Sequence, residues 1–190
     1  MTYPICVYGH PVLRKTAADI DRDYPDLQDL IASMFETMYN SEGLGLAAPQ
    51  IGKSIRLFVI DGTPVSDEEP ELAGFKKAFI NARITEKEGD LRLMTEGCLS
   101  IPHLREEVNR EERIRITYYD ENWEFHDEVY TGYLARIIQH EYDHLDGVLF
   151  TDRVNPLRKR LLKSKLTAIS KGRFEADYKT ILPGQKIKSI

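Results

Sequence analysis

Two histidines stand four residues apart in the segment Gln139-His140-Glu141-Tyr142-Asp143-His144, and a carboxylate follows the first of them directly. In an α-helix, positions i and i+4 lie on one face, about 6 Å apart along the axis, so both rings can reach one metal ion. Glu141 lies about 100° further round the helix, where it cannot join that face but can contact a water held by the metal. The pattern predicts a catalytic metal site in which Glu141 carries a proton.

A catalytic zinc-type site generally has three protein ligands and one position left for water, so a third ligand is needed. A third histidine shortly after the pair is excluded, because Phe150 occupies its place. A downstream carboxylate is limited to Glu175, in a polar tail whose sequence gives no reason to fold back. Upstream, Cys98 follows a glycine and offers a thiolate. Two ligand sets therefore stand open, the histidine pair with Cys98 in one hydrolase and with Glu175 in a metallopeptidase.

Structural interpretations of the same residues also exist. A structural metal module would have four protein ligands and no open position. Taken alone, a cysteine is more often a small buried apolar residue than a ligand. We assign Cys6 to this packing role, because it lacks the accompanying residues that single out Cys98.

The composition is that of a compact protein in water. The 190 residues, 42% of them hydrophobic and 30% charged, suffice for one domain with a sizeable core. No apolar run approaches the ~18 residues of a membrane span, and the first residues lack the pattern of a signal peptide. We therefore expect a cytoplasmic protein with no membrane partner.

Hydrophobic periodicity predicts the elements that position these residues. Apolar residues at spacings of three and four predict an amphipathic helix between Asp26 and Asn40. A second helix, capped by Thr131, is expected to run to about Leu145, with Gly147 as its stop. Strands are expected over 55–60, 78–84, 113–119 and 123–130, and loops over 43–52 and 61–74. This order favours an α+β fold with antiparallel strands.

Three segments together resemble the signature motifs of the peptide deformylase family, in the family's order and at similar separation. They are Gly-Leu-Gly-Leu-Ala-Ala-Pro-Gln over 43–50, Glu-Gly-Cys-Leu-Ser over 96–100, and the histidine segment over 139–147. The resemblance implies a mixed α+β fold, with antiparallel β-sheets around a central helix that bears the two histidine ligands. It implies removal of the formyl group from the N-terminal formyl-methionine of nascent polypeptides, with release of formate.

The resemblance also implies roles for single residues. Cys98, His140 and His144 would bind one divalent metal ion, Fe²⁺ in the native enzyme, with Zn²⁺, Ni²⁺ or Co²⁺ as substitutes. Glu141 would pass a proton from water to the leaving amine, while the Gln50 amide and the Leu99 main chain would stabilise the carbonyl oxygen. Substrate contacts are expected from Leu44, Gly45, Gly97, Arg105, Tyr133 and Ile137. The glycine at 45 would allow close approach of the substrate main chain.

The net charge of −5 is unevenly distributed, because the segment 153–171 carries seven Lys or Arg and no acidic residue. A basic helix is predicted over 156–169, with an apolar side formed by Leu157, Leu161, Leu162, Leu166 and Ile169. This helix either packs on the domain with its lysines in water or, as in some bacterial deformylases, binds the ribosome with a steep salt dependence. We expect one catalytic domain over 1–171 and a C-terminal tail of unknown role over 172–190.

Overall fold

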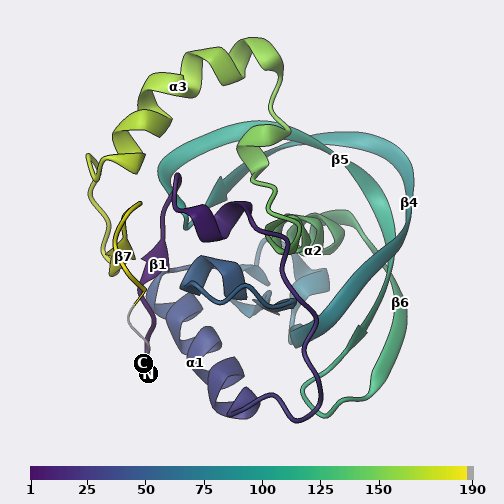
Figure 1. Ribbon diagram of the computed structural model, residues 1–190. Coiled ribbons are helices and arrows are strands. Elements are labelled where there is room, and N and C mark those ends of the chain that lie inside the picture. The colour runs from purple at the N-terminus through teal and green to yellow at the C-terminus, as the bar shows by residue number, and fades with distance from the viewer. Residues whose placement is uncertain (188–190) are drawn as a thin grey trace.

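A curved antiparallel sheet wraps around the helix that carries both histidines (Figure 1). In this computed structural model, which describes residues 1–187, each strand of the sheet pairs with the next one along the chain. The strands are β2 (Gly45–Ala47), β3 (Leu57–Asp61), β4 (Lys76–Cys98), β5 (Ile101–Tyr119) and β6 (Phe125–Thr131). The expected mixture of helices with an antiparallel sheet is confirmed.

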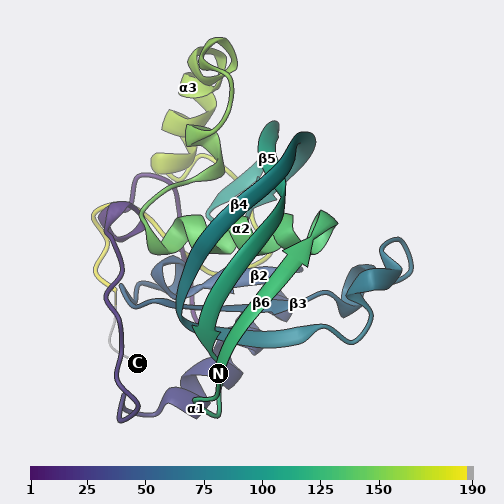
Figure 2. The same ribbon diagram turned by 90° about the vertical axis from the view of Figure 1, so that its right-hand side faces the viewer.

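Helix α2 (Gly132–Leu145) follows β6 directly and lies inside the curve of the sheet (Figure 2). Ten of its side chains are buried, so it is covered on most of its surface. Thr131 occupies the N-cap position as predicted, but its side chain makes no capping hydrogen bond. Gly147 ends the segment with a φ of 71°, a backbone conformation that favours glycine. The helix therefore has the predicted bounds, with a weaker cap than expected.

The long hairpin of β4 and β5 departs most from the predicted strands. The predicted strands over 78–84 and 113–119 are only the two ends of this hairpin, which also includes the intervening Cys98. Cys98 pairs with Ile101, so Leu99 and Ser100 form the turn at the tip. Ile114, Ile116 and Tyr118 are all buried on one face of β5. The first metal-ligand candidate thus sits at the tip of the longest hairpin.

Helix α1 (Leu27–Asn40) confirms the predicted amphipathic helix. Its apolar stripe packs against β2 and β3 in a core cluster that includes Leu30, Met34, Met38 and Leu46. Because this cluster lies under β2, α1 supports the strand that approaches α2.

Helix α3 (Pro156–Ser170) lies at the opposite end of the molecule from α1 (Figures 1 and 2). The Asn155 side chain accepts a hydrogen bond from the Leu157 backbone N–H at 2.9 Å and so caps the helix. Leu162, Leu166 and Ile169 are buried, but Leu157 and Leu161 remain 68% and 62% exposed. The predicted apolar side is therefore wrong in its first half, because nothing in the described chain covers that half of the helix.

Both predicted loops contain ordered structure. The segment 43–52 contains β2 and a 3₁₀ helix over Ala48–Ile51, and the segment 61–74 begins in β3 and contains two 3₁₀ turns. These turns span Thr63–Val65 and Pro70–Leu72, and Leu72 is fully buried. Further 3₁₀ turns span Pro11–Arg14 and Phe150–Asp152.

The tail folds back onto the body, contrary to the expectation from its polar sequence. β7 (Thr180–Ile181) pairs in parallel with β1 (Ile5–Cys6), and the two lie side by side in Figure 1. Cys6 is fully buried beside Val12, Leu13 and Ile181, which agrees with its assignment to packing. The antiparallel expectation therefore fails for this small sheet.

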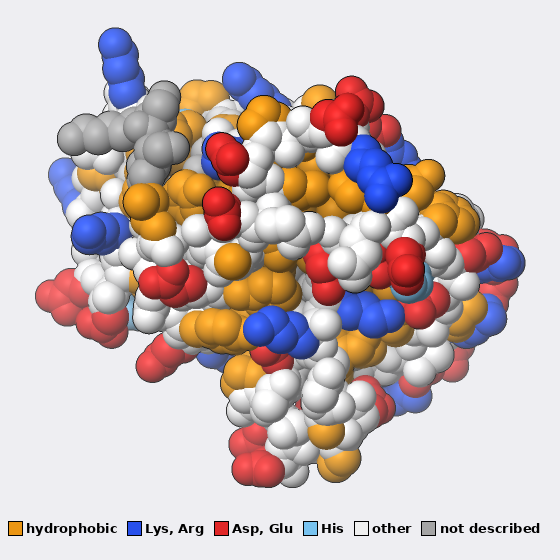
Figure 3. Space-filling view, turned by 90° about the horizontal axis from the view of Figure 1, so that it is seen from below, with side chains coloured by type: hydrophobic (Ala, Val, Ile, Leu, Met, Phe, Trp, Pro, Cys, Tyr) orange, Lys and Arg blue, Asp and Glu red, His pale blue; other side chains and the backbone are white. Residues whose placement is uncertain are grey.

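Charges of both signs mix with apolar side chains on the face seen in Figure 3, among the residues that the structure describes there. That face carries no extended patch of a single sign. Within residues 1–187, no helix has the length and apolar character needed to cross a membrane.

Candidate metal centre and active site

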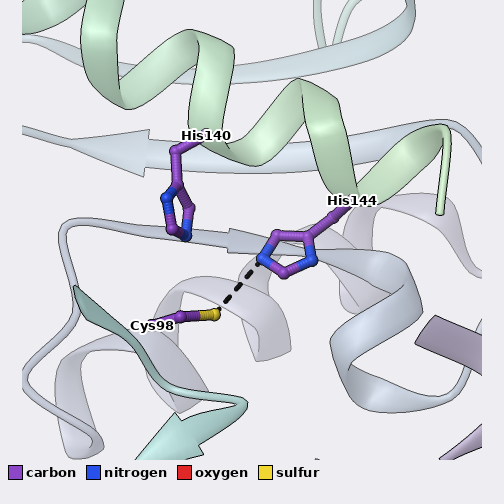
Figure 4. A group of neighbouring side chains, drawn as sticks. All are labelled: Cys98, His140 and His144. Atoms are coloured by element: carbon purple, nitrogen blue, oxygen red, sulfur yellow. Dashed lines mark hydrogen bonds between the residues drawn. The ribbon is translucent and has the colours of Figure 1, made fainter. Parts of the chain in front are cut away.

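The rings of His140 and His144 project from α2 toward Cys98 at the hairpin tip (Figure 4). The Cys98 Sγ lies 3.4 Å from the His144 Nε2. One donor atom from each of the three residues falls within 4.8 Å of the other two. Elements separated by more than forty residues in sequence thus place one sulfur and two ring nitrogens together.

This donor set fits a tetrahedral transition-metal ion. Bonds of about 2.3 Å to sulfur and about 2.0 Å to nitrogen, at a tetrahedral angle, separate the two donor atoms by about 3.5 Å. The observed 3.4 Å between Cys98 and His144 matches that separation. Burial lowers the pKa of His144 well below its usual value, which keeps the imidazole in the neutral form that binds a metal.

Glu175, the alternative third ligand, does not join the group. Its side chain is exposed, and its backbone carbonyl accepts a hydrogen bond from the His103 Nε2 at 2.5 Å. In the group of possible ligands that the described residues form around the histidine pair, the third member is Cys98. The geometry therefore favours the thiolate set over the metallopeptidase set.

Glu96 fixes the orientation of His140. The His140 Nδ1 donates to a Glu96 carboxylate oxygen at 2.9 Å, which leaves Nε2 free to act as a metal ligand. Arg110 donates to both oxygens of the same carboxylate at 2.6 and 2.9 Å, and Arg136 donates to one at 2.7 Å. Burial alone would raise the pKa of Glu96, but the hydrogen bonds from Arg110 and His140 outweigh it and hold the pKa well below its usual value. The carboxylate is thus a permanent anion behind the ring.

The network continues to the far side of α2 through Asp143. Arg110 also donates to Asp143 at 2.8 Å, and Arg153 donates to both Asp143 oxygens at 2.6 Å. Arg110 is only 2% exposed, so its charge depends on the two carboxylates. Breaking one partner would leave an uncompensated buried charge next to the ligand helix.

Glu141 is buried beside β2, where Gly45 makes room for it. A Cβ on Gly45 would lie 2.5 Å from the Glu141 Oε1, closer than any real contact of that type. The Glu141 Oε2 is buried and has no hydrogen-bond partner within residues 1–187. Burial raises the pKa of Glu141 to about 7, so this carboxyl gains and loses a proton near neutral pH. The expected approach of the substrate main chain to Gly45 stays a prediction, and the atoms nearest to the position of a Cβ there belong to Glu141.

The Gln50 side chain has a fixed orientation. Its Oε1 accepts a hydrogen bond from the Ala47 backbone N–H at 2.8 Å. Its Nε2 therefore faces the site, where it donates to Ser100 Oγ at 3.2 Å and lies 3.5 Å from the Cys98 Sγ. A donor held in this way is suited to stabilise negative charge that develops nearby.

A cavity of about 440 Å³ opens over these groups. Nearly all the residues predicted from the sequence line it, namely Leu44, Gly45, Gln50, Gly97, Cys98, Leu99, Arg105, Tyr133, Ile137, His140 and Glu141. His144 lies behind the cavity and is 2% exposed. The structure thus brings the predicted site residues to one place.

Sequence reasoning missed two parts of this site. Glu96 stands inside a motif that was recognised, so a buried acid next to the ligand cysteine was the available signal for its role. Ala176, Asp177 and Tyr178 also line the cavity, and the polar tail gave no signal for them.

Comparison with known proteins agrees with this geometry. The family model described as polypeptide deformylase matches residues 2–160. The chain belongs to this family. A peptide deformylase of Christiangramia forsetii is 52% identical, and the alignment covers 98% of both chains. A peptide deformylase of Salinibacter ruber is 49% identical over 94% of this chain and 93% of the relative.

Solved deformylase structures share the fold. The crystal structure of peptide deformylase from Thermus thermophilus superposes with a TM-score of 0.80 at 43% identity, and covers 90% of this chain and 99% of that chain. The structure from Thermotoga maritima gives 0.74 at 41% identity, over 82% and 99% of the two chains. The chain is thus a hydrolase that removes the formyl group from the N-terminal formyl-methionine of nascent polypeptides and releases formate.

Proposed function

We propose that Cys98, His140 and His144 hold the one divalent ion on which this deformylase depends. The match between the observed 3.4 Å and the tetrahedral separation supports this set. Fe²⁺ is the proposed native ion, with Zn²⁺, Ni²⁺ or Co²⁺ as substitutes, since a thiolate with two imidazoles accepts several such ions. When bound, the ion supplies Lewis-acid chemistry, which acidifies water and polarises the formyl carbonyl.

Glu141 is the proposed proton carrier. Its buried carboxyl lines the cavity beside the ligand group and has one oxygen without a partner among the described residues. Oε2 therefore has capacity to take a proton from the attacking water. The same carboxyl then gives the proton to the amine, which must be protonated before it departs. This unpartnered oxygen, buried next to the ligand group, is the observation that carries the proposal.

Gln50 and Leu99 are the proposed donors to the formyl oxygen. The Gln50 Nε2 points into the site because Ala47 holds the other end of the amide. The Leu99 backbone N–H lies at the hairpin tip, next to the proposed ligand Cys98. Losing one such donor costs about 3 kcal/mol of transition-state stabilisation in other enzymes.

The proposed methionine pocket is formed by Ile137 and Tyr133, which precede His140 on its helix face and line the same cavity. Leu44, Gly45, Gly97 and Arg105 are proposed to contact the rest of the peptide.

The proposed setting is the cytoplasm, with residues 1–171 as one catalytic domain. The exposed basic side of α3 is proposed to contact ribosomal phosphates, which co-sedimentation with ribosomes in rising salt would measure.

Formate release from formyl-Met-Ala-Ser under anaerobic conditions tests the proposed roles. Glu141→Gln preserves the size of the side chain but removes its basicity, so we expect roughly a 10²–10⁴-fold fall in kcat. The metal content of the same preparation should stay at one ion per chain. A fully loaded variant that retains wild-type turnover would remove Glu141 from its role.

A further inference from the structure

The turn that carries Cys98 is supported from outside the main sheet. The Leu99 and Ser100 carbonyls lie at the hairpin tip, beyond the ladder between β4 and β5, and buried carbonyls need partners. The Ser100 carbonyl accepts a hydrogen bond from the Tyr8 backbone N–H at 2.8 Å. The Leu99 carbonyl accepts one from the Tyr178 hydroxyl at 2.7 Å. The tip is thus held by two segments that are distant from it in sequence.

The segment that carries Tyr178 is fixed on both sides. Before it, the Glu175 carbonyl accepts a hydrogen bond from His103 of β5 at 2.5 Å. After it, the Lys179 carbonyl accepts one from the Ile5 backbone N–H at 2.8 Å, at the start of the β1–β7 pair. The Tyr178 ring itself packs against the core cluster beneath α1. The hydroxyl is therefore held at the Leu99 carbonyl by tertiary structure.

The same segment borders the active-site cavity, since Ala176, Asp177 and Tyr178 line it together with Cys98 and Leu99. The family match ends at residue 160, so this wall lies beyond the matched region. Burial, with a smaller contribution from Cys98, raises the pKa of Tyr178 to about 12, so the hydroxyl stays a donor at neutral pH.

We propose that Tyr178 is a positioning residue for the deformylase reaction. By holding the Leu99 carbonyl, its hydroxyl fixes the backbone that presents both the Cys98 thiolate and the Leu99 N–H to the cavity. This inference rests on the proposed roles of those two groups. It assigns the return segment over 172–182 a part in the active site, in place of a tail without a role.

Tyr178→Phe tests the proposal because it removes the hydroxyl and keeps the ring. The net free-energy contribution of a single hydrogen bond corresponds to roughly a 3- to 10-fold change in a rate or binding constant. We therefore expect kcat at full metal loading to fall by that factor. KM for formyl-Met-Ala-Ser should stay within about twofold, because the methionine pocket is untouched. Zinc affinity, measured by competition with a chromophoric chelator, should fall by roughly the same 3- to 10-fold.

Tyr3→Phe is the matched control. Tyr3 packs against the same core cluster, and its hydroxyl has no hydrogen-bond partner within residues 1–187. The proposal is overturned if kcat and zinc affinity of Tyr178→Phe equal those of the wild type, or fall no further than those of the control. Failure of the proposed ligand role is distinguishable, because Cys98→Ala would then keep the zinc affinity of the wild type, whereas failure of the Tyr178 inference alone would leave Cys98→Ala deficient in zinc and Tyr178→Phe unchanged.

Discussion

The position of the Glu141 side chain depends on the absence of a side chain at Gly45. Glu141 is one of the buried residues of α2. The Glu141 carboxyl lies directly over Gly45 of β2, where it would overlap a Cβ. The backbone of Gly45 does not require glycine, since its φ is outside the left-handed region. The glycine is therefore needed to leave room for the Glu141 side chain rather than to form the strand.

Gly45→Ala should lower kcat roughly 10²-fold, because the new methyl group displaces the carboxyl that is proposed to transfer the proton. Metal content, measured by atomic absorption, should be unchanged, since the ligands are untouched. Gly97→Ala is the control in the same cavity, where the nearest atom to a new Cβ is the Arg105 side chain at 3.4 Å. Because Gly97 is itself proposed to contact the peptide, the new methyl group can raise KM, but kcat at saturating substrate should stay within about twofold of the wild type. Equal losses of kcat in the two variants would show that the effect does not come from the overlap with Glu141.

At the scale of elements, a long hairpin and a helix each supply part of the candidate metal centre. The two main helices were predictable, because their apolar residues recur with the helical period and are buried. The middle of the β4–β5 hairpin was not predictable from the sequence. Residues 104 to 110 of β5 alternate between buried and exposed, but two of the buried positions hold Glu106 and Arg110. Their charges are neutralised by partners on other elements, so the apolar alternation that marks a strand is interrupted.

The site shows the same division between local and tertiary information. The motifs pointed to Cys98, His140 and Glu141, because a metal-dependent hydrolase of the proposed kind needs those residue types at those spacings, and the structure brings the three to one cavity. The return of Tyr178 to the cavity depends on pairing between β1 and β7, and no periodic pattern marks strands of two residues each. The pairing of these two short strands, which are far apart in the chain, could therefore not be predicted from the sequence.

Helix α3 provides a comparison between two leucines of one element. Leu166 is buried in a cluster with Val108, Phe150 and Leu162, while Leu161 is 62% exposed. Leu166→Ala should reduce the free energy of unfolding by about 2–5 kcal/mol, because it leaves a cavity. Leu161→Ala should change it by about 0.5 kcal/mol at most. Urea denaturation of both variants measures the difference, and comparable losses would mean that Leu161 is covered.

At the scale of the whole molecule, a polar cluster joins three strands of the main sheet. The Glu128 carboxylate of β6 accepts hydrogen bonds from Tyr118 of β5 at 2.6 Å, from Lys77 of β4 at 3.0 Å, and from Tyr130. Burial alone would raise the pKa of Glu128, but these hydrogen bonds lower it to about 2. The folded protein therefore binds a proton at Glu128 less readily than the unfolded chain does.

The stabilisation from Glu128 is present in full above the ordinary pKa of about 4.5 and is lost as the pH falls toward 2. The urea midpoint of the wild type should therefore fall across this window, and Glu128→Gln should flatten part of that fall. Glu124→Gln, an exposed carboxyl just before β6, is the control for general effects of charge and metal loss. If both variants follow the wild-type profile, the cluster does not govern acid stability.

The parallel pair of β1 and β7 also has a consequence for synthesis of the chain. Ile5 and Cys6 are fully buried and find their strand partners only at Thr180 and Ile181. At about 5–20 residues per second, translation takes roughly 10–35 s to supply those partners. During that interval β1 emerges with apolar side chains and an unpaired edge, the features that invite aggregation. In a growing chain, β1 therefore stays without its strand partner until Ile181 has been made.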